Sequence, residues 1–284
     1  MKILLIQENG HHNPNRILRE CFSWQRALQE YGDIDVHVWG QRHANFQDKP
    51  DFKKFDVIVC MENYDGNNWV PHDEIAQANV KKYVWAIDSH SKGIEYFRWV
   101  KNRGKYQTIL CSIKHHVGEN DVWFPNAYDD HIIKPLRVEK RSFIGFCGCG
   151  STPQRVNMLR DIKTKYPEFI FDEFVIGDAM VESINSFELH FNFNVMDDIN
   201  YRNFETIGCG IPLITNYNYQ YDDLGFKDGK NCIFYKDMNE LYEKIDYYKQ
   251  NKTLLKDIAI EGYKLSKKHS YRQRIKHFLK HVRE

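Results

Sequence analysis

The sequence has no long hydrophobic run, no strong net charge and no internal repeat. No apolar stretch reaches the roughly 18 residues that a membrane-spanning helix requires, which excludes an integral membrane protein. The apolar run in the opening MKILLIQENG is too short for a signal peptide. Forty basic and thirty-nine acidic residues give a net charge of +1, so no chain-wide attraction to nucleic acid or to an anionic membrane is expected.

Disulfides and zinc sites are also disfavoured. The seven cysteines are an odd number, and most lie in apolar, strand-like runs such as VIVCM and TILCS. This placement predicts buried, reduced thiols in a cytoplasmic protein. Cys147 and Cys149 have CxC spacing, but the sequence has no second Cys or Cys/His pair at zinc-ribbon spacing.

One familiar motif is missing, and one region departs from charge balance. The first strand-like run is not followed by the GxGxxG fingerprint of dinucleotide-binding enzymes, which argues against a Rossmann dehydrogenase. Residues 264–284 hold eight Lys or Arg and a single acid, so this region is locally basic. At 284 residues the chain is long enough for two domains, each with its own core.

The first half of the sequence alternates strand and helix patterns. A helix is expected to begin at Asn13 and Pro14 and to end before Gly32. Its buried face is predicted to carry Ile17, Cys21, Trp24 and Leu28. Short apolar runs predict strands at 2–6, 35–39, 56–61, 82–87 and 108–112. Runs buried on both faces that alternate with helices predict a parallel, doubly wound sheet.

After a charged, aperiodic segment at 132–141 the same pattern restarts. Strands are predicted at 142–146, 188–194 and 213–215. Helices are predicted at 151–166, with Ser151 or Thr152 as its cap and Pro153 in its first turn, and at 202–207, 238–250 and 253–268. The simplest interpretation is an α/β protein with two Rossmann-like parallel-sheet domains, 1–137 and 138–268.

The last segment, 269–284, is predicted to be a basic amphipathic helix. Its apolar stripe consists of Tyr271, Ile275, Phe278, Leu279 and Val282, and its cations are expected on the other faces.

Ligands of paired Rossmann-like domains bind at the carboxyl ends of the strands, in the cleft between the domains. The stretch GFCGCGSTPQR lies between a strand and a helix, so backbone amides near Gly148 could approach a phosphate, with Arg155 one turn into the helix. A glycine-rich interdomain turn is the alternative. Asp88 and His90 follow a predicted strand directly, and could orient or deprotonate a sugar hydroxyl. A capped loop is the alternative for that pair.

Metal ligation is the weaker interpretation of the remaining polar clusters. The doublets His11/His12 and His115/His116 are adjacent residues, whose side chains point apart on a strand or helix. His11 or His12, in the loop after the first strand, is a better candidate for an acceptor contact. The sequences FDE (171–173) and YDD (221–223) resemble carboxylate clusters that hold a divalent metal in some sugar transferases, but turn acids in solvent are commoner.

The second half also resembles a known family. RNFETIGCGIPLIT, followed by DGKNCIFYKDMNELYEKIDYYKQN and KKHSYRQR, looks like the carboxyl-terminal half of group 1 glycosyltransferases of the GT-B fold. The CgeB-like spore-maturation branch looks nearest. LRECFSWQRALQEYG, VIVCMENYD, AIDSH and FPNAYD in the first half also look like that branch, so the resemblance covers nearly the whole chain. It implies that the last helix crosses back onto the first domain.

The resemblance implies roles at matching positions. The family motif is an acid, seven intervening residues and a glutamate, which assigns Asp197 to the donor sugar and Glu205 to the ribose of a nucleotide-sugar. The first acid is normally Glu, so the shorter Asp197 departs from the pattern, and Asp198 is the alternative. Gly208 and Gly210 would keep the turn close to the donor.

Arg155 and Arg202 are the candidates for the diphosphate, since guanidinium groups stabilise a leaving diphosphate without a metal. The structural alternatives are a helix-surface arginine for Arg155 and an intrahelical salt bridge for Arg202.

The sequence therefore predicts a metal-independent transferase with a UDP- or GDP-linked sugar as donor. It would have an acceptor-side first domain and a donor-binding second domain. Retention of configuration is implied by the family alone. The acceptor stays open among a glycan, a protein or lipid carrier and a modified DNA base such as a hydroxymethylated pyrimidine. A non-catalytic nucleotide-sugar-binding or scaffold protein that kept the fold is the alternative.

Overall fold

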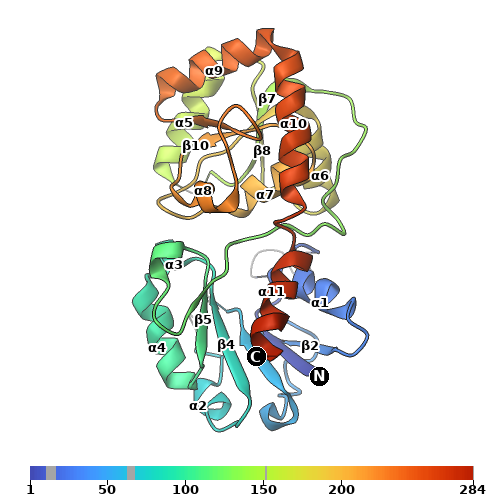
Figure 1. Ribbon diagram of the computed structural model, residues 1–284, viewed down its shortest axis with the longest axis vertical. Helices are drawn as coiled ribbons and strands as arrows, with labels where there is room; N and C mark the ends of the chain where they lie inside the picture. Colours follow the sequence, from blue (N-terminus) through green and yellow to red (C-terminus); the bar gives the residue numbers. More distant parts are fainter. Residues whose placement is uncertain (11–16, 63–67, 151, 284) are drawn as a thin grey trace. The chain divides into compact units, whose positions relative to one another are not determined.

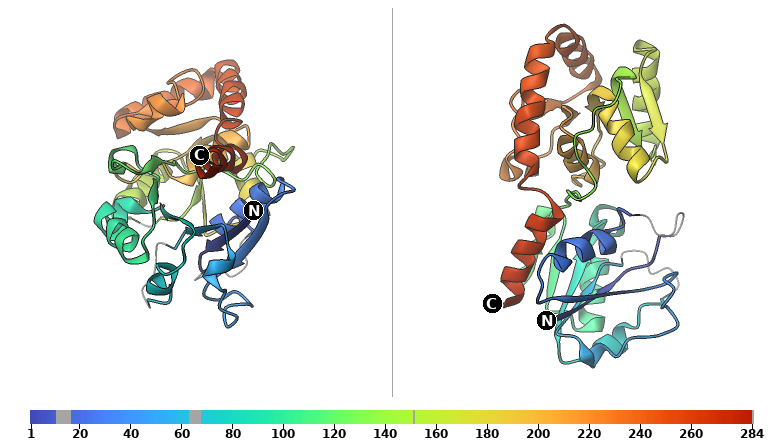
Figure 2. Two further views of the ribbon diagram at one scale, coloured as in Figure 1. Left: turned by 60° about the horizontal axis from the view of Figure 1, so that its bottom comes forward. Right: turned by 90° about the vertical axis from the view of Figure 1, so that its right-hand side faces the viewer.

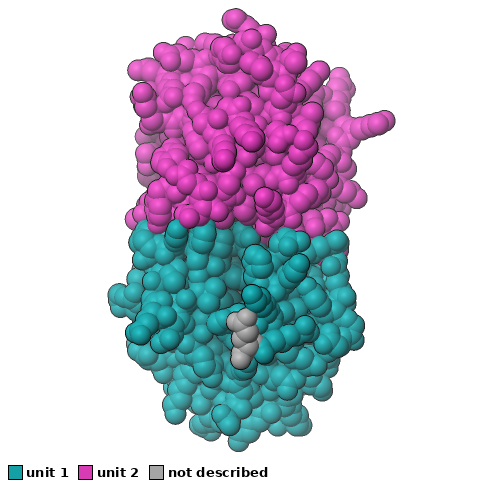
Figure 3. Space-filling view, in the orientation of Figure 1, with its two compact units in different colours: residues 1–126, 271–284 teal, residues 127–270 magenta. Residues whose placement is uncertain are grey.

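The computed structural model describes residues 1–10, 17–62, 68–150 and 152–283. These residues form two compact units, coloured separately in Figure 3. Unit 1 comprises Met1–Asn126 and Tyr271–Glu284, and unit 2 comprises Ala127–Ser270. Each unit is built on a parallel sheet, which confirms the predicted α/β class.

Unit 1 contains a six-stranded parallel sheet in the order β2-β1-β3-β4-β5-β6 (Figure 1). The strands are β1 (Lys2–Ile6), β2 (Asp35–Trp39), β3 (Val57–Cys60), β4 (Lys81–Ala86), β5 (Thr108–Cys111) and β6 (Val122–Trp123). Strands β3 and β5 are buried at every residue. This is why they appear in the sequence as unbroken apolar runs rather than as alternating patterns.

The helices of unit 1 include one from the far end of the sequence. They are α1 (Glu20–Gln29), α2 (His72–Ile75), α3 (Ser89–Lys92), α4 (Ile94–Gly104) and α11 (Tyr271–Arg283), with 3-10 turns η1 (Phe52–Lys54) and η2 (Lys114–His116). Helix α11 packs against α1, as Figure 1 and both views of Figure 2 show. The predicted apolar stripe of α11 is buried along its length, so the return of the last helix to the first domain is confirmed.

Unit 2 contains a five-stranded parallel sheet in the order β11-β10-β9-β7-β8. Its strands are β7 (Ser142–Gly148), β8 (Ile170–Glu173), β9 (Phe187–Phe191), β10 (Leu213–Asn216) and β11 (Ile233–Tyr235). Its helices are α5 (Pro153–Lys165), α6 (Asp178–Asn185), α7 (Tyr201–Gly208), α8 (Gln220–Leu224), α9 (Met238–Gln250) and α10 (Lys252–Ser266). Helix α5 begins as predicted, because the Thr152 side chain accepts a hydrogen bond from Arg155 N and Pro153 occupies the first turn.

Several predicted elements differ in their bounds, and in three of them the difference changes where a named residue lies. Helix α1 begins at Glu20, well after the predicted start, because the backbone of Arg19 is extended and its side chain pairs with Glu8 and Glu20. Ile17 is accordingly exposed rather than on the buried face, and Asn13 and Pro14 lie outside the described residues. Strand β9 ends at Phe191, three residues earlier than predicted. Strand β7 runs on to Gly148, so Gly145 lies inside a strand.

One cation of the last helix is not on its solvent faces. Arg274 is buried, and its Nε donates to Pro125 O at 2.9 Å while its Nη2 donates to Asn126 O at 3.3 Å. Burial lowers the pKa of Arg274 to about 10. Among the described residues, every helix is too short or too polar to cross a membrane.

Candidate functional site

A small pocket opens where β7 and β9 of unit 2 end. It has a volume of about 170 Å³, and its lining residues are Phe146, Gly148, Cys149, Arg155, Asn192, Asn200, Tyr201 and Arg202. Parallel doubly wound sheets bind ligands at this edge, so the pocket is the candidate site of unit 2. Three of the residues proposed from the sequence, Gly148, Arg155 and Arg202, meet there.

Helix α7 carries the charged pair of the site. The Asn200 side chain caps the helix by accepting a hydrogen bond from Arg202 N at 3.1 Å. One turn along the helix, Glu205 Oε2 lies 2.6 Å from Arg202 Nη1, and both side chains are largely buried. The same nitrogen lies 2.7 Å from Met180 Sδ of α6. Arg202 thus makes the intrahelical salt bridge of the structural alternative and also lines the pocket, whereas Glu205 is not among the pocket's lining residues. The guanidinium is a planar donor for phosphate oxygens, and the carboxylate beside it is an acceptor for hydroxyl groups.

His190, which the sequence did not single out, joins α7 to the sheet. It is completely buried on β9, and its Nε2 accepts a hydrogen bond from Cys147 N at 3.1 Å. Nε2 is therefore unprotonated, so Nδ1 carries the proton and donates it to Thr206 Oγ1 at 2.9 Å. Thr206 Oγ1 in turn donates to Arg202 O at 2.6 Å. Burial lowers the pKa of His190 well below its usual value, and the Arg202 charge acts in the same direction.

Arg155 connects two loops of the pocket. Its Nη1 donates to Cys149 O at 2.9 Å and its Nη2 donates to Phe193 O at 2.9 Å. The guanidinium also lies over the ring of Phe146, 5.9 Å from its centroid. Burial lowers the pKa of Arg155, and Arg202 acts in the same direction. Arg155 is thus a buried residue that orders the pocket, and not the helix-surface arginine of the structural alternative.

A buried amide network supports the loop between β9 and α7. Asn203 Nδ2 donates to Asn194 Oδ1 at 2.7 Å, and Asn194 Nδ2 donates to Tyr221 Oη at 2.6 Å. Tyr221 Oη donates to Asn203 Oδ1 at 2.7 Å, and Asn192 Nδ2 to the same oxygen at 3.1 Å. In the sequence, Asn192 and Asn194 in the FNFN run are the signal for this network, whereas the sequence pattern predicts a strand over 188–194. Their side chains satisfy one another, so these polar residues can be buried beyond the end of β9.

The two candidate first acids lie in different surroundings. Asp197 is exposed, and its backbone oxygen accepts a hydrogen bond from Gln220 Nε2 at 2.6 Å. Asp198 is buried, and its charge raises the pKa of Arg155 against the larger effect of burial. Solvent access therefore distinguishes Asp197 from its neighbour.

The glycines near the site have packing reasons of their own. A Cβ at Gly148 would lie 2.8 Å from the Phe146 ring, and one at Gly208 would lie 2.6 Å from the Tyr128 ring. Gly210 has φ +69°, a left-handed conformation that favours glycine. Gly208 is the last residue of α7, so Gly210 rather than Gly208 makes the turn towards β10.

The site residues proposed for the first domain lie in unit 1. Asp88 precedes α3, and its backbone oxygen accepts hydrogen bonds from Ser91 N and Lys92 N. His90 is half-buried in α3, and the neighbouring Ser89 Oγ lies 2.8 Å from Nδ1 of His116, a contact that the sequence did not indicate. His11 and His12 lie outside the described residues.

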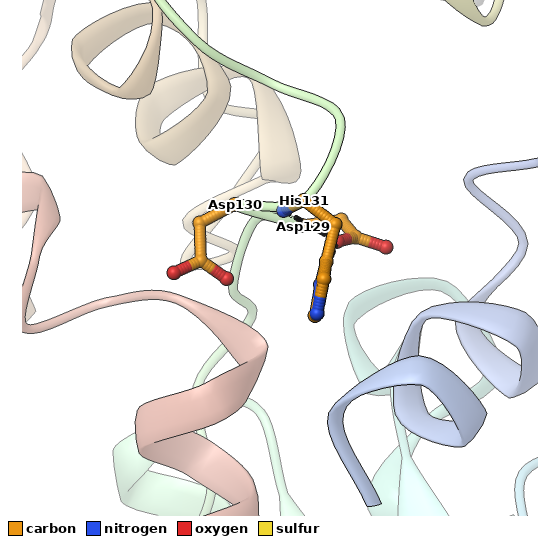
Figure 4. Close-up of side chains that lie close together, drawn as sticks. All are labelled: Asp129, Asp130 and His131. Atoms are coloured by element: carbon orange, nitrogen blue, oxygen red, sulfur yellow. Dashed lines mark hydrogen bonds and ion pairs between the residues drawn. The ribbon is translucent and has the colours of Figure 1, made fainter. Parts of the chain in front are cut away.

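One group of potential metal ligands occurs within the described chain. One ligand atom each of Asp129, Asp130 and His131 lies within 4.8 Å of the others. His131 Nδ1 is hydrogen-bonded to Asp129 Oδ1 at 3.0 Å, and Figure 4 shows the Asp130 carboxylate extending away from that pair. Two of the possible ligand atoms, His131 Nδ1 and Asp129 Oδ1, are thus already hydrogen-bonded to each other.

The acids of FDE and YDD have protein partners instead. Asp172 pairs with Arg141 and accepts from Ser183 Oγ at 2.6 Å, and Asp222 accepts from Tyr217 Oη at 3.0 Å.

Comparisons with known proteins identify the family and the fold. The family described as glycosyl transferase-like matches residues 138–280, half of the chain. The fold is similar to that of HepE from Anabaena in complex with UDP and glucose, at 13% identity and TM-score 0.71 over 99% of each chain. Sucrose-phosphate synthase from Thermosynechococcus elongatus is similar at 10% identity and TM-score 0.70, over 99% of this chain and 98% of that one.

An alpha-glucosyltransferase in complex with UDP and a 13-mer DNA is similar at 10% identity and TM-score 0.70, over 100% of both chains. No curated protein matches the sequence significantly. The match over 138–280 and the two parallel-sheet units together lead to one assignment: the chain belongs to the glycosyl transferase-like family and is a glycosyltransferase with the GT-B fold.

Proposed function

We propose that the protein transfers a sugar from a UDP-linked donor to an acceptor hydroxyl, and that unit 2 binds the donor. The sequence left uridine and guanosine nucleotides open. HepE with UDP-glucose and an alpha-glucosyltransferase with UDP share the fold over 99% and 100% of this chain, which supports uridine.

The observation that carries the proposal is that Arg202 lines the pocket at the end of β7 and β9 while its guanidinium is held by the buried Glu205. Glu205 is the acceptor for ribose hydroxyls, and Arg202 neutralises the diphosphate. A leaving diphosphate gains negative charge in the transition state, and a guanidinium fixed before the reaction stabilises it without reorganisation. Arg155, which holds the loops of Cys149 and Phe193, adds positive potential and keeps the pocket in shape.

The finer assignments follow the resemblance to group 1 enzymes. Asp197 contacts the donor sugar, since it is the solvent-accessible acid at the matching position. Retention of configuration follows from the family alone. The reaction needs no metal, because arginines take the place of a cation at the diphosphate. In such a mechanism the donor phosphate helps to take the acceptor proton. His90 and Asp88 of unit 1 then orient the acceptor or act as auxiliary base, and His11 and His12 contribute acceptor contacts.

The acceptor is a glycan or carrier, with a modified DNA base as the second candidate. Exposed Arg272, Lys276, Lys280 and Arg283 on α11 favour a polyanion, and the alpha-glucosyltransferase above was solved in complex with a 13-mer DNA. Duplex affinity that falls steeply with salt would support the DNA acceptor, and absence of duplex binding at low salt would end it. The CgeB-like branch stays our nearest assignment within the family.

A reducing, cytoplasmic location is supported by the thiols. Six of the seven cysteines are buried, and burial raises the pKa of Cys21 and Cys111 to about 12.

The proposal is tested by sugar transfer from UDP- and GDP-sugars, together with thermal shift by UDP and GDP. We expect UDP to raise the melting temperature, because a ligand bound only by the native state stabilises it. Turnover should disappear in Glu205→Ala and fall strongly in His90→Ala. If UDP binds but no donor turns over with any acceptor class or with water, the non-catalytic binder is the correct function. The Asp at position 197, shorter than the family Glu, is the feature that favours this second candidate.

A further inference from the structure

The sheet of unit 2 ends one strand early on the β8 side. The common six-strand order of doubly wound sheets is 3-2-1-4-5-6. In the order β11-β10-β9-β7-β8, β7 takes position 1 and β8 position 2, so no described strand takes position 3. Residues 174–177 lead from β8 directly into α6, which leaves no intervening segment to fill this place.

The flank of β8 has apolar surface and a hollow on each face. Between α5 and β8 lies a groove of about 480 Å³, with Val156, Leu159, Phe169, Ile170 and Phe171 among its lining residues. On the other face, a second hollow of about 550 Å³ lies between Asp172 and α6. Val156 is 46% exposed and Phe171 is 36% exposed. An open strand edge beside exposed apolar side chains is a template for pairing with another strand.

The two ends of this strand edge carry opposite charges. Lys163 Nζ donates to Phe169 O at 2.7 Å, so a cation is fixed at the start of β8, and Arg160 lines the same groove. Glu173 is the last residue of the strand, is exposed, and accepts a hydrogen bond from Gly150 N at 3.2 Å. On the α5 face the edge is thus basic at one end, apolar in the middle and acidic at the other, while the Arg141–Asp172 ion pair lies on the opposite face.

We infer that a second copy of this chain covers this edge, with its β8 paired antiparallel to the first. A strand in the empty position completes a sheet that is one strand short. A two-fold axis through the pair formed by Phe171 and the partner's Phe171 sets Phe169 opposite Glu173 of the partner subunit. That register brings the acidic end of each strand to the basic end of the other, and joins the two apolar grooves. A self-complementary surface of this kind is what an isologous dimer requires.

The test is the solution mass of the whole chain across micromolar concentrations, measured by light scattering after size exclusion. We expect a dimer, twice the 34.0 kDa of one chain. Val156→Glu should give a monomer. Arg160→Glu and Glu173→Arg should each weaken the dimer about tenfold or more, since each places like charges opposite each other. The double variant Arg160→Glu/Glu173→Arg should restore it.

Lys256→Glu, the same change of charge on the exposed face of α10, is the matched control and should leave the dimer intact. Hydrogen exchange locates the contact: amides of 170–173 should be protected in the dimer and exchange faster in Val156→Glu. A monomer at all concentrations would overturn the inference. A dimer insensitive to Val156→Glu, or one whose β8 amides exchange freely, would do the same. Failure of the double variant to regain the dimer would refute the antiparallel register.

Discussion

Thr206 accepts a hydrogen bond from a completely buried histidine: His190 Nδ1 lies 2.9 Å from Thr206 Oγ1, which itself donates to Arg202 O. The backbone of β7, a side chain of β9 and the charged turn of α7 are thereby joined by consecutive hydrogen bonds. Rotation or displacement of α7 would break this series, so the position of the Arg202–Glu205 pair depends on it.

Replacement of Thr206 by a residue of the same shape should therefore lower UDP affinity without leaving a cavity in the core. Thr206→Val keeps the shape but leaves the buried Nδ1–H of His190 without its acceptor, a cost of about 1–3 kcal/mol. We expect a lower melting temperature and up to roughly tenfold weaker UDP binding by calorimetry. Thr206→Ser, which keeps the hydroxyl, should bind UDP as the parent does. Equal UDP affinity in the Val and Ser variants would contradict this role.

Because His190 is neutral in the fold, the free energy of unfolding should depend on pH in the acidic range. Its pKa in the fold lies well below the usual value because of burial, so protonation favours the unfolded chain. The contribution of neutral His190 to the free energy of unfolding is complete above about pH 6.5, and it is lost progressively as the pH falls towards the lower, folded-state pKa. Thermal unfolding between about pH 7.5 and 4.5 should show this loss, and His190→Gln should reduce the slope below pH 6.5. A slope unchanged in His190→Gln would assign the acid sensitivity to other groups.

Removing the carboxylate of Glu205 should affect nucleoside recognition. Glu205→Gln loses charge-assisted acceptance of ribose hydroxyls and leaves Arg202 without its ion-pair partner, so UDP affinity should fall about ten- to a hundredfold. The control is Glu182→Gln on α6, an acid that lines the separate hollow beside Asp172. Calorimetry with UDP and with uracil separates ribose contacts from contacts to the base. Unchanged UDP binding in Glu205→Gln would remove this residue from the donor site.

Chelation should leave donor binding intact. If arginines neutralise the diphosphate, the thermal shift by UDP should be the same in EDTA and in added Mn²⁺. Asp130→Asn, which removes one of the three clustered ligands, should also leave turnover unchanged. A strict requirement for a divalent cation, abolished in Asp130→Asn, would show that the cluster near residue 130 serves the reaction.

Gly208 should not tolerate a methyl group. Its Cβ would meet the ring of Tyr128 at 2.6 Å, and that buried ring is held by Ser266 Oγ, 3.1 Å from its hydroxyl. Overpacking of this kind costs about 1–3 kcal/mol, more than the helix propensity of alanine returns. Gly32→Ala, where nothing lies within 4 Å, is the control. Denaturant unfolding compares the two, and equal midpoints would mean that Tyr128 moves without cost.

The sequence predicts the elements whose burial produces a local pattern, such as an apolar run or a helical spacing of apolar residues. Strand β10 and helix α7 were recognisable because an apolar run and a helical spacing flank a glycine turn. Arg202 and Glu205 were found through the family motif, which the local pattern alone does not carry.

The supporting polar groups were not predictable. His190 lies within a strand pattern, where a histidine is usually a surface residue, and its role depends on Thr206, which is 16 positions away. Arg274 was expected in solvent because its charge is visible in the sequence, whereas the carbonyls of Pro125 and Asn126 that accept from it are not. Contacts between side chains distant in sequence have no local signature.

Helix α11 makes unit 1 discontinuous in sequence, because this helix follows unit 2 along the chain. Phe278 of α11 lies 5.1 Å, centroid to centroid, from Trp24 and from Tyr83, so the aromatic centre of that unit is assembled from both extremes of the chain. During synthesis, all residues of unit 2 are therefore made before the helix that completes the core of unit 1. Fragment 1–126 made alone should expose those rings and bind a synthetic peptide of residues 271–283.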